Sequence, residues 1–95
     1  MAVNYTAFEA LSVSTTSVGF TSATYGNADF ATVQVEGGSV RARFDNTAPT
    51  ASVGYVFDDG DTIELESGNE IARVHFISVD GGTITLHANF GVEEG

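Results

Sequence analysis

The sequence contains no cysteine, no tryptophan and no lysine, and its only proline is Pro49. Without cysteine the chain can form neither a disulfide nor a thiolate metal site. Its two histidines, His75 and His87, are too few for a typical zinc site. A small domain without such cross-links is marginally stable by itself, so oligomerisation is the remaining means of stabilisation.

Basic residues are also scarce. The basic side chains are Arg41, Arg43 and Arg73, against 13 Asp and Glu, which gives a formal net charge of −10. A strongly negative surface repels nucleic-acid phosphates and anionic lipids, so the composition predicts no nucleic-acid partner and no membrane partner. The first residues lack the basic and apolar regions of a signal peptide, and no apolar run is long enough to span a bilayer.

The 95 residues are the length of one domain. No window of helical length has a sustained 3.6-residue period, whereas short runs rich in Val, Thr, Phe and Tyr alternate with turn residues. We therefore predict an all-β fold: a compact antiparallel β-sandwich, jelly-roll-like, with seven or eight short strands in a single domain, 1–95. Residues 1–9 are expected to form a loose N-terminal arm, and residues 91–95 a short, frayed acidic tail.

Glycine pairs and an Asp-Gly step predict three tight hairpins. Gly37-Gly38 would join strands at 30–36 and 39–45, with Val33 opposite Ala42 and Val35 opposite Val40 on an apolar face. Asp59-Gly60 is a signal for a type I′ turn. The other predicted strand pairs are 51–57 with 62–66 and 71–80 with 83–90, after a first short pair turning at 14–17. Loops are expected at 21–29, with one helical turn, at 45–50 around Pro49, and at 67–70.

The acidic cluster Asp58, Asp59 and Asp61 is the weak candidate for a metal site, because hard cations need several oxygens at close range. Its spacing does not match the twelve-residue calcium loop, and a solvated hairpin turn accounts for it. We therefore assign no metal site and expect no cofactor.

No pattern in the sequence predicts catalysis. The carboxylates crowd one turn instead of facing each other across a cleft, as a glycosidase pair would. No G-x-S-x-G nucleophile motif is present. His75 alternates with apolar residues and His87 with polar ones, as expected of a core or interface histidine and a solvated one. We predict no catalytic residues, and that the protein is not an enzyme.

A set of side chains points instead to binding another protein. Arg41 and Arg43 share the outer face of one predicted strand and need carboxylate partners, either within the chain or on a neighbouring subunit. Aromatic residues are numerous for so small a domain, which indicates a second buried face, either a second sheet or a subunit interface. These features predict Arg41, Arg43, Tyr55, Phe57 and Phe76 as interface residues. The exposed corner at 45–52 adds Asn46, Thr47 and Pro49, on the strength of the resemblance described next.

The segment VRARFDNTAPTASVGYVFDDGDTIELES, followed by NEIARVHFISVDGGTITLHANFG, resembles a group of small virion structural proteins of tailed phages and prophages. The preceding TSATYGNADFATVQVEGG is similar in layout, so the resemblance covers roughly residues 18–92. It implies a protein that decorates or cements the capsid by binding the assembled shell. A tail or head–tail component is the alternative, and the resemblance brings no catalytic residues.

From this resemblance we expect the major capsid protein as partner, a homotrimer at a local threefold position, and a location in the virion, which is assembled in the host cytoplasm. The second hypothesis is a carbohydrate-binding module on the virion surface. It requires an exposed aromatic platform, for which Tyr25, Tyr55 and Phe57 are the candidates.

Overall fold

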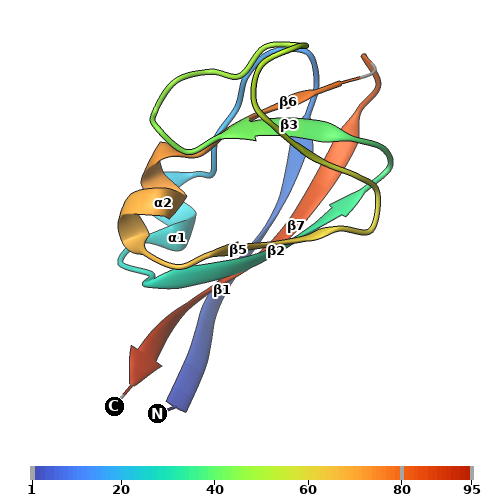
Figure 1. Ribbon diagram of the computed structural model, residues 1–95. Coiled ribbons are helices and arrows are strands. Elements are labelled where there is room, and N and C mark those ends of the chain that lie inside the picture. The colour runs from blue at the N-terminus through green and yellow to red at the C-terminus, as the bar shows by residue number, and fades with distance from the viewer. Residues whose placement is uncertain (1, 80, 95) are drawn as a thin grey trace.

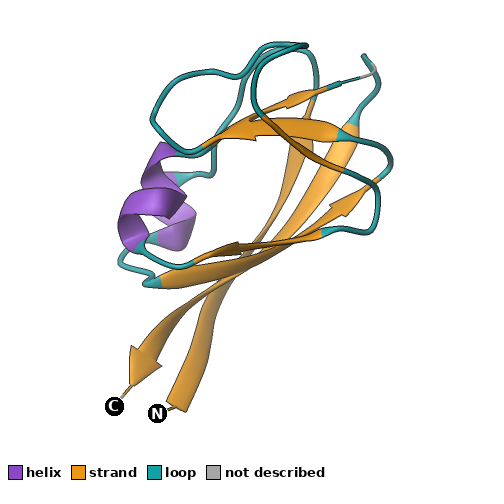
Figure 2. Ribbon diagram, viewed as in Figure 1, coloured by secondary structure: helices purple, strands orange, loops and turns teal. Residues whose placement is uncertain are grey.

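The computed structural model describes residues 2–79 and 81–94, and its strands form two antiparallel sheets packed face to face (Figures 1 and 2). This arrangement confirms the all-β sandwich, with seven strands in the described part of the chain. The strands are β1 (Ala2–Val13), β2 (Phe30–Glu36), β3 (Val40–Arg43), β4 (Tyr55–Phe57), β5 (Thr62–Leu65), β6 (His75–Ser78) and β7 (Ile84–Glu94), and the helices are α1 (Ser22–Tyr25) and α2 (Gly68–Arg73).

The strand order is β1-β7-β2-β5 in the four-stranded sheet and β4-β3-β6 in the three-stranded sheet. Only β3 and β4 are both consecutive in the chain and paired with each other. Every later connection, and that from β2 to β3, carries the chain from one sheet to the other. The fold therefore depends on pairing between segments that are far apart in the sequence.

The three hairpins predicted from glycine signals are wrong. Gly37-Gly38 joins β2 to β3, Asp59-Gly60 joins β4 to β5, and Gly81-Gly82 lies between β6 and β7, and each pair of strands belongs to different sheets. The turn at Asp59-Gly60 has positive φ at Gly60 only, so it is not type I′. Asp80, the last residue of the strand predicted at 71–80, lies outside the described residues.

The inward faces of β2 and β3 were nevertheless predicted correctly. Val33, Val35, Val40 and Ala42 are all buried, but they face one another from opposite sheets instead of pairing side by side. Alternation of apolar residues specifies which side of a strand is buried, whereas it does not specify the neighbouring strand. Two strands that lead across a sandwich show the same alternation as a hairpin.

Three phenylalanines occupy the centre of the core. The Phe20 ring packs edge-on against both Phe76 and Phe90, with ring centroids 5.5 and 5.2 Å apart. Phe76 is completely buried, because it lies opposite Ala42 on the inner face of the three-stranded sheet. The prediction of Phe76 as an interface residue is therefore wrong.

Both ends of the described chain are strands. β1 pairs with β7 from Ala2 opposite Glu94 to Val13 opposite Ile84, and Figure 1 shows their ends extending together beyond the rest of the sandwich. The predicted loose arm at 1–9 and frayed tail at 91–95 are wrong for residues 2–9 and 91–94, because each segment supplies the other's backbone hydrogen-bond partners. Met1 and Gly95 lie outside the described residues. The predicted first strand pair is also wrong, since Val18 bridges to Phe76 of β6.

The loop expected at 67–70 is the start of α2. The hydroxyl of Ser67 accepts a hydrogen bond from the Glu70 amide at 3.1 Å, and the Glu70 carboxylate accepts one from the Glu66 amide. This is a variant of the capping box, because the glutamate bonds the amide of the residue before the N-cap Ser67 instead of that of Ser67 itself. The signal, Ser-x-x-Glu before Ile71, is present in the sequence. The single helical turn expected within 21–29 is confirmed as α1.

Gly91 is predicted to be intolerant of any side chain. It lies in β7 between Tyr5 of β1 and Phe30 of β2, and a Cβ atom there would come within 2.5 Å of the Phe30 ring and 2.7 Å of the Asn4 carbonyl oxygen. Gly91→Ala should therefore lower the free energy of unfolding by about 1–3 kcal/mol. Urea denaturation measures this change.

Gly82→Ala is the matched control, because a Cβ atom at Gly82 would meet nothing within 4 Å. That variant should lie within about 0.5 kcal/mol of the parent protein. Equal stability of the two variants would contradict the close packing of β1, β7 and β2 around Gly91.

Candidate interaction surface

The connection between the paired strands β3 and β4 is the loop from Phe44 to Gly54, called here the 44–54 loop. It leaves β3 after Arg43 and returns at Tyr55 of β4, which lies opposite Ala42 of β3. Asn46, Thr47 and the residues at 50–53 are exposed, so the loop presents solvent-facing side chains at the end of the three-stranded sheet. The expected corner around Pro49 is therefore present, while the strand expected from residue 51 begins only at Tyr55.

Arg41 holds this loop in place. Its Nε–H donates to the Ala51 carbonyl oxygen at 3.0 Å, and its Nη1 donates to the Gly54 carbonyl oxygen at 2.7 Å. Charge-assisted hydrogen bonds of this kind are stronger than neutral ones. Arg41 was expected to pair with a carboxylate, and it instead satisfies two backbone carbonyl groups of the loop.

Gly54 and Pro49 pack against each other within the 44–54 loop. A Cβ atom at Gly54 would lie 3.1 Å from both the Pro49 Cβ and the Ala42 carbonyl oxygen, and the φ angle of Gly54 is 133°. Both features require glycine at this position. Pro49 is buried, so its prediction as a contact residue is wrong: it supports the loop from within.

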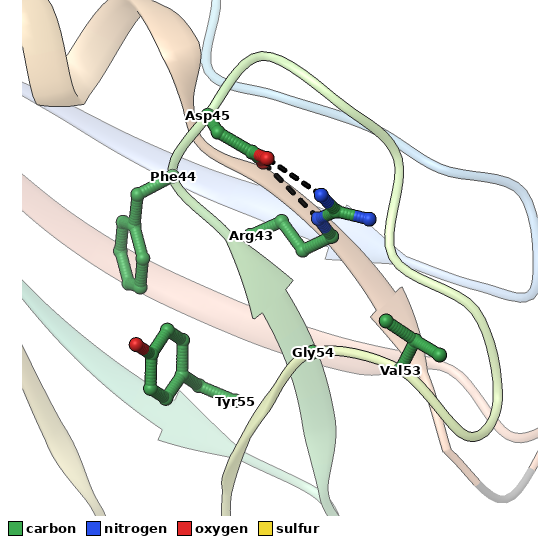
Figure 3. Close-up of a pocket in the computed structure, with 6 residues that line it drawn as sticks. All are labelled: Arg43, Phe44, Asp45, Val53, Gly54 and Tyr55. Carbon is green, nitrogen blue, oxygen red and sulfur yellow. Dashed lines mark hydrogen bonds and ion pairs between the residues drawn. The ribbon is translucent and has the colours of Figure 1, made fainter.

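Arg43 pairs with Asp45 within the chain. Its Nε and Nη2 donate to the two carboxylate oxygens at 3.1 and 2.5 Å (Figure 3). This hydrogen bond lowers the pKa of Asp45 and raises that of Arg43. Because the pKa of Asp45 is depressed in the folded protein, the pair is formed at neutral pH and is lost as the pH falls through that lowered pKa. Both groups face solvent, so the pair orients the guanidinium more than it stabilises the fold.

An open hollow of about 560 Å³ lies between the loop and the start of β4. It is lined by Arg43, Phe44, Asp45, Val53, Gly54 and Tyr55, which Figure 3 shows arranged around it. The Phe44 and Tyr55 rings are 5.7 Å apart at their centroids, and the Tyr55 side chain is 67 % exposed. Val53, which also lines the hollow, is exposed, so with Phe44 and Tyr55 it gives the hollow an apolar border. Val56 is exposed too, but it is not among the lining residues.

Most of the interface residues predicted from the sequence gather at this hollow or beside it. Asn46 and Thr47 are exposed on the loop; the Asn46 amide donates to the Arg73 carbonyl oxygen, and its side chain contacts His75 Nε2 at 3.3 Å. Phe57 is half-buried and packs against the core. Phe44, Val53 and Val56 were missed, although apolar residues on both faces of the segment 53–57 were a signal of a second contact surface.

The acidic turn connects β4 to β5, and its carboxylates accept the hydrogen bonds that hold it. Asp58 accepts a hydrogen bond from the Ser39 hydroxyl at 2.7 Å, Asp59 from the Gly37 amide at 3.0 Å, and Asp61 from the Asp58 amide at 2.7 Å. These contacts join two neighbouring turns. In the described part of the chain, no group of three or more His, Asp or Glu side chains is gathered as a metal site would require.

Comparison with known proteins gives no match to a family model, to a curated protein or to a solved structure. Within residues 2–79 and 81–94, no helix has both the length and the apolar character needed to cross a membrane.

Arg41→Met is predicted to loosen the 44–54 loop. The substitution keeps the apolar length of the side chain but leaves the Ala51 and Gly54 carbonyl groups without their donor, which should cost about 1 kcal/mol or more. Amide hydrogen exchange across the loop should become faster. Arg43→Met is the matched control, because Arg43 bonds only to the exposed Asp45 side chain in the described structure. Equal loosening by both variants would show that Arg41 does not anchor the loop.

Proposed function

We propose that this protein is a structural component of a phage particle that binds the assembled capsid shell and cements it. The observation that carries the proposal is the rigid, exposed 44–54 loop, with Val53, Tyr55 and Val56 displayed beside it on an otherwise acidic sandwich. The resemblance of residues 18–92 to small virion structural proteins supports it, and so do the exposed apolar and aromatic side chains of the surface.

Charge favours this surface as the side that meets another protein. Residues 40–57 contain two Arg and one Asp, a formal charge of +1. Since the whole chain has a net charge of −10, the remainder of the chain has a net charge of −11. The surface around the 44–54 loop is therefore the part of the molecule on which an acidic partner meets least repulsion. The acidic remainder can face solvent and keep the decorated particle soluble.

Rigidity favours it as well. Because Arg41, Pro49 and Gly54 hold the loop in one conformation, binding costs little conformational entropy. A tyrosine and an arginine beside an apolar hollow are the residue types that dominate protein–protein binding energies. Many such copies, each contacting neighbouring capsid subunits, would act as clamps against expansion by packaged DNA. The same surface would serve in a tail or head–tail position.

The direct test mixes the purified protein with undecorated shells of the virus that encodes it. We expect saturable, stoichiometric binding that raises the melting temperature of the shell. Val53→Glu should weaken binding about tenfold or more, because it places a carboxylate in the apolar border of the hollow.

Gln34→Glu is the control for this test, since it adds the same charge at an exposed position of β2 in the other sheet. It should bind like the parent protein. Absence of binding by the parent, or equal weakening by the two variants, would count against the capsid role of this surface.

Carbohydrate binding is the second candidate function, and one observation favours it. The open hollow is lined by both the exposed Tyr55 ring and the Arg43–Asp45 pair, and an aromatic ring with fixed hydrogen-bonding groups in one hollow suits a sugar. Of the other candidates for the platform, Tyr25 packs against Phe90 at 5.9 Å and Phe57 packs against the core. The candidate site is therefore reduced to Tyr55.

Glycan-array binding tests this second function. Tyr55→Ala should abolish any binding found, whereas Tyr5→Ala, at a tyrosine of similar exposure on β1, should leave it unchanged. Absence of binding by the parent protein, or binding that survives Tyr55→Ala, would overturn it.

A further inference from the structure

The two sheets have four edge strands, and three of them are protected against pairing with another chain. β4 and β6 contain only three and four residues, and β6 is also bridged by Val18. β5 has four residues, carries Glu64, and follows the acidic turn. Short strands and charged side chains are the usual protection of sheet edges.

The fourth edge strand, β1, is longer than the other three and carries less of this protection. It has twelve residues, contains no lysine or proline, and its one charged residue is Glu9. The Glu9 carboxylate accepts hydrogen bonds from the Thr21 amide at 3.0 Å and the Thr21 hydroxyl at 2.8 Å, so this charge is engaged within its own chain. A bulge at Thr6 bends the strand, and residues 7–13 continue in regular register with β7.

Side chains along β1 are also suited to contact with another strand. Phe8 is 55 % exposed on the outer face of the sheet, where its ring stacks on His87 with centroids 6.2 Å apart. Ala10 and Ser12 follow on the same face and are small and exposed. Antiparallel pairing of residues 7–13 with themselves would be centred on Ala10, placing each large Phe8 opposite a small Ser12.

We propose that β1 is a strand-addition interface and that its occupant is β1 of a second copy of this chain. The two strands pair antiparallel across a twofold axis at Ala10, which joins the two four-stranded sheets into one. This pairing satisfies the unpaired backbone groups of both edges.

The distribution of charge supports a second copy as the occupant. The chain carries −10, so two copies repel each other unless their acidic parts stay apart. In the order β1-β7-β2-β5, the acidic turn next to β5 lies at the opposite edge of the sheet from β1. Joining at β1 therefore places the two acidic edges at the far ends of the combined sheet.

The twofold pairing closes with two copies, because the same strand is used by both partners. It gives a dimer in place of the trimer expected from the sequence. The inference does not depend on the capsid role, and its test uses the purified protein alone.

Sedimentation over a concentration series tests the proposal. The parent protein should form a dimer, and Ala10→Lys and Phe8→Lys should each weaken dimerisation about tenfold or more. Each substitution lowers the net negative charge, so increased repulsion cannot explain a monomer. Thr62→Lys, with the same change at the exposed β5 edge, should remain dimeric. Circular dichroism confirms that each variant is folded.

Cysteine cross-linking gives a second, independent readout. Because the chain has no cysteine, Ala10→Cys can form only an intermolecular disulfide, and we expect rapid oxidation to a covalent dimer. Thr62→Cys should stay monomeric on the denaturing gel. A monomeric parent protein, a trimer, or a dimer that is unaffected by the lysines at 8 and 10 and does not cross-link through residue 10 would overturn the proposal.

Discussion

The pairing of β1 with β7 is the interaction on which the rest of the sandwich depends. It joins the two ends of the described chain along nearly their whole length, and β7 passes the connection on to β2 and through it to β5. No disulfide is available to hold these segments, because the chain has no cysteine. Backbone hydrogen bonds and the burial of Phe20, Phe76 and Phe90 between the sheets do so instead. Such long-range pairing predicts slow folding for a domain of this size.

The two surfaces proposed for binding arise from different features of this framework. The 44–54 loop is a long excursion from the three-stranded sheet, and it is useful for recognition because Arg41 and Gly54 hold it in one conformation. The β1 edge belongs to the four-stranded sheet and results from the strand order, which leaves the first strand of the chain at the margin. One surface therefore offers side chains and the other offers backbone groups, so the two proposed contacts, with a shell and with a second copy, would not compete for the same residues.

Several acidic side chains accept hydrogen bonds that hold turns and the start of a helix, in addition to supplying negative charge. Asp58 and Asp59 accept hydrogen bonds that join the β4–β5 turn to the β2–β3 connection, and Asp61 accepts one from the Asp58 amide within its own turn. Glu70 accepts one from the Glu66 amide at the start of α2. Carboxylates are well suited to these positions because exposed turns and helix starts present unpaired backbone amides. The same residues supply the charge that distinguishes the acidic remainder of the molecule from the surface around the 44–54 loop.

Local sequence patterns predicted the all-β class, the inward faces of β2 and β3, the short helix α1 and the exposed corner with Asn46 and Thr47. These follow from local patterns: alternation, turn residues and the conformational limits of Pro49. Only the tertiary structure shows which strands pair, that Phe76 and Pro49 are buried, and which groups Arg41 bonds. It also shows that the two end segments of the described chain form paired strands instead of loose tails. The physical reason is that alternation and glycine specify the direction in which a side chain or turn faces, whereas a strand's neighbour is selected by packing across the whole sandwich.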